Sequence, residues 1–160
     1  MMRSNLAVLL AFLFITATAF AESSRPLPRF ASLRANEVNL RVGPGTNYEI
    51  SWVYRRKALP VEIIAEFDTW RKIRDAEGTT GWVQQTMLSP KRTALITAQR
   101  RILRENPEDT ASPAAYIDPG IIVSINQCKG EWCQLKAPGR ITGWLKRGEM
   151  WGLYPNEFAP

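Results

Sequence analysis

The sequence predicts an all-β protein that consists of two tandem small β-barrels following a cleavable signal peptide. Three observations carry this prediction: one segment occurs twice along the chain, apolar and polar residues alternate inside each copy, and turn residues recur at short intervals. Alternation with a period of two is typical of strands that bury one face. No stretch of residues 22–160 shows the apolar stripe of a capped amphipathic helix.

The repeat is visible in two blocks. Residues 33–44 align with residues 96–107, and residues 61–83 align with residues 123–145 without a gap. The second alignment superimposes two tryptophans of one copy on two tryptophans of the other. The best helical candidate, residues 93–104, aligns with a strand of the first copy, and we therefore expect it to be extended as well.

The repeat also defines the domain organisation. The expected segments are a signal peptide at 1–21, a flexible leader at 22–31, a first barrel at 32–88, a linker at 89–94 and a second barrel at 95–160. The second barrel ends in an aromatic tail that contains Trp151, Tyr154 and Phe158. We expect this tail to dock on its own barrel or across the linker.

Turn signals divide the first copy into short runs. In chain order they fall at residues 43–47, 57–60, 67–69 and 77–78. Turns this close together predict a meander that closes on itself, because closure removes unpaired edges from a unit near the lower size limit for an independent core. The apolar residues predicted to fill this core are Leu33, Val38, Leu40, Val53, Val61, Ile63, Ile73, Val83 and Leu88.

The first 21 residues are typical of a signal peptide. Arg3 supplies a positive start, residues 6–20 carry no charge, and Ala19-Phe20-Ala21 has the small-x-small cleavage pattern. The uncharged run is shorter than the roughly 20 residues that a spanning helix needs; a retained membrane anchor is the alternative. We therefore expect an exported protein, periplasmic or secreted, with no membrane span in the mature chain.

The composition argues against most enzyme classes. The chain contains no histidine and two cysteines, so a Ser-His-Asp or Cys-His hydrolase and the usual zinc sites are not expected. The remaining acids, such as Glu149 and Asp75, show no motif spacing. We predict no catalytic residues, no metal and no cofactor. The net charge of +6 is modest, and the basic clusters at 55–57, 91–92 and 100–101 are either solvated surface or contacts for acidic envelope partners; nucleic acid is not an expected partner.

The two cysteines predict a disulfide across one hairpin. If Cys128 and Cys133 flank a four-residue loop at 129–132, they lie directly opposite each other and can bridge. The alternative, a redox-active pair, lacks the C-x-x-C spacing. The matching residues of the first copy are Glu66 and Arg71, for which we predict a cross-strand ion pair.

The tryptophans suggest a ligand surface. Trp70 and Trp132 have the opposite strand parity to the aliphatic residues that follow them, so they are expected to point outward. Beside Tyr48 or Tyr54 they would form an aromatic platform for a ligand. The alternative is that each tryptophan covers its own barrel or the neighbouring one.

The motifs Val38-Asn39-Leu40-Arg41-Val42-Gly43-Pro44-Gly45-Thr46-Asn47-Tyr48, Trp70-Arg71-Lys72-Ile73-Arg74 and Gly78-Thr79-Thr80-Gly81-Trp82-Val83 resemble those of bacterial SH3-like (SH3b) domains. The second copy departs from the pattern, since it lacks the Gly-Pro-Gly-Thr turn. The resemblance implies five-stranded barrels and a non-catalytic binding role. We therefore expect an exported binding module that recognises peptidoglycan stem peptides or an envelope partner protein; the alternative is a structural accessory subunit without a small ligand.

Overall fold

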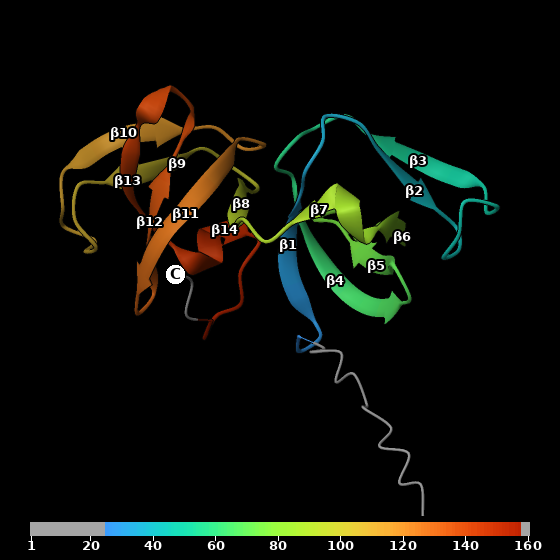
Figure 1. Cartoon of the computed structure of the whole chain (residues 1–160). Helices are drawn as coiled ribbons and strands as arrows, with labels where there is room; N and C mark the ends of the chain where they lie inside the picture. Colours follow the sequence, from blue (N-terminus) through green and yellow to red (C-terminus); the bar gives the residue numbers. More distant parts are fainter. Residues whose placement is uncertain (1–24, 158–160) are drawn as a thin grey trace, which may run out of the picture.

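The structure, a computed structural model, describes residues 25–157 and consists of two β modules in tandem (Figure 1). We call residues 29–89 module 1 and residues 93–157 module 2. Each module forms its own seven-stranded antiparallel sheet within the described residues. This confirms the predicted all-β fold of two tandem units, although each sheet has seven strands rather than the expected five. The predicted signal peptide, 1–21, lies outside the described residues.

Module 1 runs through seven strands and one short 3-10 helix. The sheet order is β3-β2-β6-β5-β4-β1-β7, so β3 and β7 are its edges. The first strand begins at Arg29, because β1 pairs with both β4 and β7. The last three residues of the predicted leader, 22–31, therefore belong to β1. The elements are β1 (Arg29–Leu33), β2 (Val38–Arg41), β3 (Ile50–Tyr54), β4 (Pro60–Phe67), β5 (Trp70–Arg74), β6 (Thr80–Gln84), η1 (Gln85–Met87) and β7 (Leu88–Ser89).

Module 2 repeats this topology strand for strand. Its sheet order is β10-β9-β13-β12-β11-β8-β14. The register shift between Ile63 and Ala65 in β4 recurs between Ile125 and Gln127 in β11. The elements are β8 (Thr93–Ile96), β9 (Arg101–Arg104), β10 (Pro113–Ile117), β11 (Ile122–Lys129), β12 (Trp132–Lys136), η2 (Pro138–Arg140), β13 (Thr142–Lys146), η3 (Arg147–Glu149) and β14 (Met150–Trp151).

Each module is built around its own apolar core. Eight of the nine residues predicted for the core of module 1 are buried; Val53 is not. In β3 it is Tyr54 that lies opposite buried Val38, whereas Val53 lies opposite exposed Asn39. Directly opposed residues of an antiparallel pair share a face, so Tyr54 takes the core position that the alternation had assigned to Val53.

The repeated Gly-Trp pair has a packing reason. A Cβ added at Gly81 would lie 2.5 Å from Cγ of Leu40, and one added at Gly143 would lie 2.7 Å from Cβ of Leu103. In both modules glycine is therefore required where the sixth strand passes close to the second. The following tryptophan is buried in module 2 (Trp144) and half-buried in module 1. Among residues 25–157, no helix has the length and apolar character that crossing a bilayer requires.

Candidate functional site

The four aromatic residues proposed as a ligand platform occupy different environments. Trp70 and Trp132 are half-buried at the first positions of β5 and β12. Tyr48 is 43% exposed, but Tyr54 is only 6% exposed and its hydroxyl donates to Oδ2 of Asp75 at 2.8 Å. Burial and this bond raise the pKa of Tyr54 well above its ordinary value. Tyr54 is therefore a core residue and presents no ring to a ligand, which corrects its assignment to the platform.

An exposed apolar surface lies instead on the β2–β3 hairpin of module 1. We call it the hairpin surface; its members are Val42, Tyr48, Ile50 and Trp52, which are 59%, 43%, 46% and 59% exposed. Strand β3 is a sheet edge, so the hairpin surface lies beside unpaired backbone groups. Sequence reasoning did not single out Trp52, since its exposure depends on the edge position of β3.

The loop of this hairpin is held from inside module 1. Arg41 donates from Nη1 to the carbonyl oxygens of Tyr48 (2.6 Å) and Thr46 (3.1 Å). A side chain at Gly43 would collide with the ring of Tyr48, so glycine lets that ring lie across the loop. The hairpin surface is thus presented on a supported loop. Arg104 repeats the bond in module 2, to the carbonyl of Ala111 at 2.7 Å.

The corresponding hairpin of module 2 lacks such a surface. Ile50 lies opposite Arg41, and Trp52 opposite Leu40. In module 2, Pro113 lies opposite Arg104 and Ala115 opposite Leu103. The two large apolar side chains of module 1 are therefore replaced by a proline and an alanine. Strand β10 keeps one large exposed apolar residue, Tyr116, at 64% exposure.

The two modules meet at an aromatic contact, which we call the seam. Phe30 of β1 lies 5.0 Å from Trp151, edge to face, and 4.8 Å from Tyr154 between ring centroids. The hydroxyl of Tyr154 donates to Oε1 of Glu62 at 2.6 Å across the seam, and Arg74 donates to the other oxygen of this buried carboxylate. Burial and the bond to Glu62 raise the pKa of Tyr154 well above its ordinary value.

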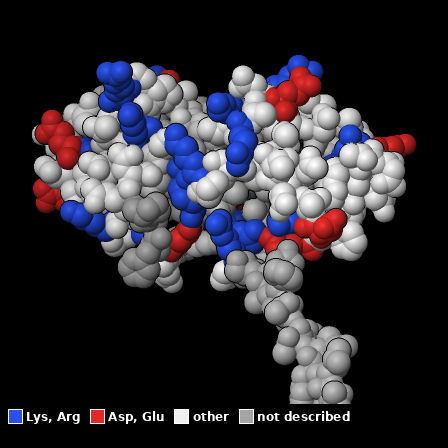
Figure 2. All heavy atoms as spheres, in the orientation of Figure 1, with Lys and Arg blue, Asp and Glu red and all other residues white. Residues whose placement is uncertain are grey.

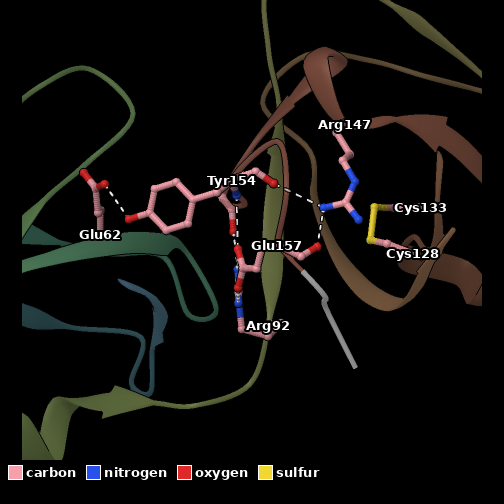
Figure 3. A network of polar contacts seen from close by, with 8 residues as sticks. Glu62, Arg92, Cys128, Cys133, Arg147, Tyr154 and Glu157 are labelled. Atoms are coloured by element: carbon pink, nitrogen blue, oxygen red, sulfur yellow. Dashed lines mark hydrogen bonds and ion pairs between the residues drawn. A yellow bond between two sulfur atoms is a disulfide. The ribbon is translucent and has the colours of Figure 1, made fainter. Parts of the chain in front are cut away.

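A second set of contacts ties the C-terminal segment to the linker and to the disulfide hairpin (Figure 3). Arg92 pairs with Glu157 and donates to the carbonyl of Gly152 at 2.8 Å. Arg147 donates to the carbonyls of Glu157 (2.6 Å) and Gly130 (2.7 Å). Burial opposes ionisation of Glu157, yet the bonds from Arg92 and from the Tyr154 amide hold the pKa of Glu157 below its ordinary value. This network holds the C-terminal segment, which carries Tyr154 to the seam, against the linker and module 2.

The predicted disulfide is present between Cys128 and Cys133, whose Cα atoms are 4.0 Å apart. The cysteines are directly opposed, as expected, but the turn is tighter than expected: Lys129 also pairs with Trp132, which leaves Gly130 and Glu131 in the turn. Gly130 has φ +55°, a conformation that favours glycine.

Several charged residues of the described chain form ion pairs with one another. In module 1 the predicted pair is also present, with Nε of Arg71 3.0 Å from Oε1 of Glu66, and Arg29 binds the same oxygen. Over residues 25–157, no group of three or more cysteine or carboxylate side chains is placed to hold a metal ion.

Several solved structures resemble the chain. They include NlpC1 and NlpC2 from Trichomonas vaginalis and an NlpC/P60 family protein from Bacillus cereus ATCC 10987. Their sequence identities are 13%, 12% and 12%, with TM-scores of 0.36, 0.37 and 0.34. The matches cover 83%, 85% and 82% of this chain, which spans 49%, 52% and 58% of the three proteins. At these scores the likenesses carry no argument about function.

A search of curated proteins found no significant match. The family comparison, in contrast, matches twice: the bacterial SH3 domain model fits residues 34–90 and 98–152, one match in each module and more than half of the chain together. With its duplicated topology and its glycine and tryptophan positions repeated in both modules, the chain belongs to the bacterial SH3 domain family, whose members are binding modules.

Proposed function

We propose that this chain is an exported, non-catalytic binding protein of the cell envelope that docks on a partner protein through the hairpin surface of module 1. The observation that carries the proposal is the gathering of four exposed apolar residues on one hairpin: Trp52, Ile50, Tyr48 and Val42. Exposed apolar residues gathered on one element of a domain mark interaction sites, and Trp and Tyr are among the residues that most often dominate binding energy.

The family and the chemistry of the chain support a binding role. Bacterial SH3 domains are binding modules, and the chain has no histidine for acid–base work near neutral pH. The two tyrosines whose pKa is strongly raised owe this to burial and to hydrogen bonds within the fold, since Tyr54 donates to Asp75 and Tyr154 donates to Glu62. Both tyrosine hydroxyls are thus engaged in hydrogen bonds within the fold, which supports recognition rather than catalysis.

A second candidate function is recognition of peptidoglycan stem peptides. The observation that favours it is the matched placement of Trp70 and Trp132, half-buried at the same position in both modules. Two equivalent surfaces suit a polymer that repeats, because simultaneous engagement raises the effective affinity. The hairpin surface, in contrast, exists in one module alone and suits a single partner.

The test compares three variants of the purified chain. Trp52→Ala is expected to weaken binding to a partner purified from solubilised envelopes by about 30-fold, the effect of losing a hot-spot residue. The matched control is Tyr116→Ala, which removes an exposed aromatic ring from the other hairpin and is expected to leave the dissociation constant unchanged. Both variants should keep the wild-type melting temperature, because exposed side chains add little stability.

The third variant, Trp70→Ala with Trp132→Ala, separates the two candidates. Two results together would overturn the hairpin proposal and support stem-peptide recognition. The wild-type chain would be retained on insoluble cell wall while the double variant is not, and Trp52→Ala would bind the partner as the wild type does. Loss of partner binding in Trp52→Ala alone supports the hairpin proposal.

A further inference from the structure

A basic groove runs between the two modules. Figure 2 shows Lys and Arg side chains gathered along the middle of the molecule, where the modules meet. The groove has a volume of about 590 Å³, within the range of ligand sites. Four cationic residues line it, with no aspartate or glutamate: Arg56, Lys57, Lys91 and Lys136.

These four cations have no ionic partner in the part of the chain that the structure describes. None of them is among the residues that form salt bridges between positions 25 and 157. A second groove, at the seam and lined by Phe30 and Tyr154, differs in this respect, because three of its arginines have ionic partners. There Arg29 and Arg71 share the carboxylate of Glu66, and Arg92 is paired with Glu157. The positive charge of the basic groove is thus not balanced by ion pairs within the described residues.

The two walls of the basic groove are held at a fixed distance. The hydroxyl of Thr93, a buried residue, donates to the carbonyl of Ala58 at 2.8 Å. Arg56 of module 1 donates to the carbonyl of Gly120 in module 2 at 2.6 Å. The cations therefore converge from three segments: Arg56 and Lys57 from module 1, Lys91 from the linker and Lys136 from module 2. Like charges held together in this way create a positive field that attracts an anionic ligand.

The rest of the lining decides between classes of anion. Ile121, Ile122, Ala137 and Pro138 provide apolar surface, and Asn36 and Ser124 provide hydrogen-bonding groups. No aromatic residue lines the groove, so the stacking surface on which single-stranded nucleic acids depend is absent from it. Three of the four cations are lysines, which bind carboxylates as point charges rather than by the planar fork of arginine. An extended peptide with carboxylates for the lysines and small apolar side chains for the floor matches this lining.

We propose that the basic groove binds an acidic segment of a partner protein, an extended peptide in which Asp or Glu alternates with small apolar residues. This site is additional to the hairpin surface and does not depend on it. The groove is lined by residues of both modules and of the linker, so it exists only while the seam holds the modules together. Peptide binding would therefore be a function of the tandem arrangement that neither module has alone.

The experiment measures fluorescence anisotropy of labelled eight-residue peptides with the purified chain, its disulfide intact. The probe alternates Glu with Ala or Val, and the matched peptides carry Gln or Lys at the Glu positions. The Glu peptide is expected to bind, and its affinity is expected to fall as salt rises, because salt screens exposed charges. Binding of the Gln peptide with equal affinity would overturn the proposal.

Charge-reversal variants test whether the peptide binds in the basic groove. Lys57→Glu, Lys91→Glu and Lys136→Glu should each raise the dissociation constant about tenfold, since a like charge then faces the carboxylates. The control is Lys129→Glu, which makes the same charge change at an exposed hairpin lysine outside the groove and should change it less than about twofold. An equal loss in Lys129→Glu would show that only net charge matters and would overturn the site. If a reversed variant loses its cooperative melting transition, Lys→Gln at the same position replaces it.

Two further arms separate this proposal from others. Trp52→Ala should bind the Glu peptide with wild-type affinity, so the groove and the hairpin surface succeed or fail independently. Retention on cell wall that depends on Lys136, without any binding of the Glu peptide, would overturn the proposal in favour of a wall polymer. Tighter binding of a single-stranded oligonucleotide than of the Glu peptide would overturn it in favour of nucleic acid.

Discussion

The two modules share one topology but hold the same hairpin together by different chemistry. In module 2, Cys128 and Cys133 are directly opposed and form a disulfide; in module 1 the opposed residues are Glu66 and Arg71, which form an ion pair. The ion pair includes a third member, Arg29, which binds the same carboxylate from β1. One cross-strand position is thus secured covalently in one copy and by a three-residue charge cluster in the other.

This difference reaches the seam. Ala31 pairs with Val61, and Ala94 pairs with Val123, so the residues two positions earlier, Arg29 and Arg92, are equivalent. In module 2 the carboxylate is replaced by a cysteine, and Arg92 pairs instead with Glu157 of the C-terminal segment. The disulfide therefore does more than close a hairpin: it leaves an arginine available to hold the segment that carries Tyr154 to module 1.

Among the changes that test this difference between the modules, removal of the disulfide is expected to have the largest effect on stability. Cys128→Ser with Cys133→Ser should lower the unfolding free energy of module 2 by about 2 kcal/mol, the chain-entropy contribution of so short a loop. Calorimetry under oxidising conditions measures the change. Chemical reduction of the wild-type chain should reproduce it. If module 2 melts at the same temperature with and without the disulfide, the covalent link is dispensable and the contrast between the modules fails.

A smaller effect is expected at the seam itself. Tyr154→Phe removes the hydroxyl that donates to Glu62 and should reduce the stability of the complete chain by about 1.5 kcal/mol, as for other hydrogen bonds to a charged group. The ring remains on Phe30, so the change isolates the hydrogen bond. Tyr116→Phe, at an exposed tyrosine, is the matched control. Urea titration of the three proteins measures the difference, and equal midpoints would mean that the bond across the seam contributes nothing.

The charge cluster of module 1 should contribute less than the disulfide of module 2. Glu66→Gln leaves Arg29 and Arg71 without their carboxylate and should cost about 1 kcal/mol, the upper end for partly exposed ion pairs. Glu105→Gln, at an exposed glutamate, serves as the control. If Glu66→Gln lowered the unfolding free energy more than the disulfide variant does, the charge cluster would contribute more stability than the disulfide, contrary to this expectation.

Acid should weaken the seam through Glu157, with an effect of about 1 kcal/mol or less. The pKa of Glu157 is lowered in the folded chain, so its contribution is fully present above the unfolded value of roughly 4.3 and is lost as the pH falls through the folded pKa. The difference in unfolding free energy between the wild type and Glu157→Gln should therefore shrink between pH 6 and pH 3. A difference that stays constant over this range would show that the pKa of Glu157 is not lowered in the folded chain.

The patterns that depend on neighbours along the chain were predictable. The repeat and the alternation of residues such as Val61 and Ile63 predicted two all-β units, because the pleat of a strand forces alternate side chains onto opposite faces. The separation of Cys128 from Cys133, and of Glu66 from Arg71, predicted which side chains meet across a hairpin. These contacts are close in sequence, so the spacing alone determines them.

The two surfaces proposed for binding depend on contacts that form only in the folded chain. Tyr54 rather than Val53 lies in the core because it pairs with buried Val38, whereas Val53 pairs with exposed Asn39. The exposure of Trp52 depends on β3 lying at the edge of its sheet, and the basic groove exists only where Lys57 and Lys136, from separate modules, are brought together. Local periodicity therefore specifies the two modules and their hairpin links, whereas the seam and the groove follow from packing between residues distant in the chain, which no local pattern encodes.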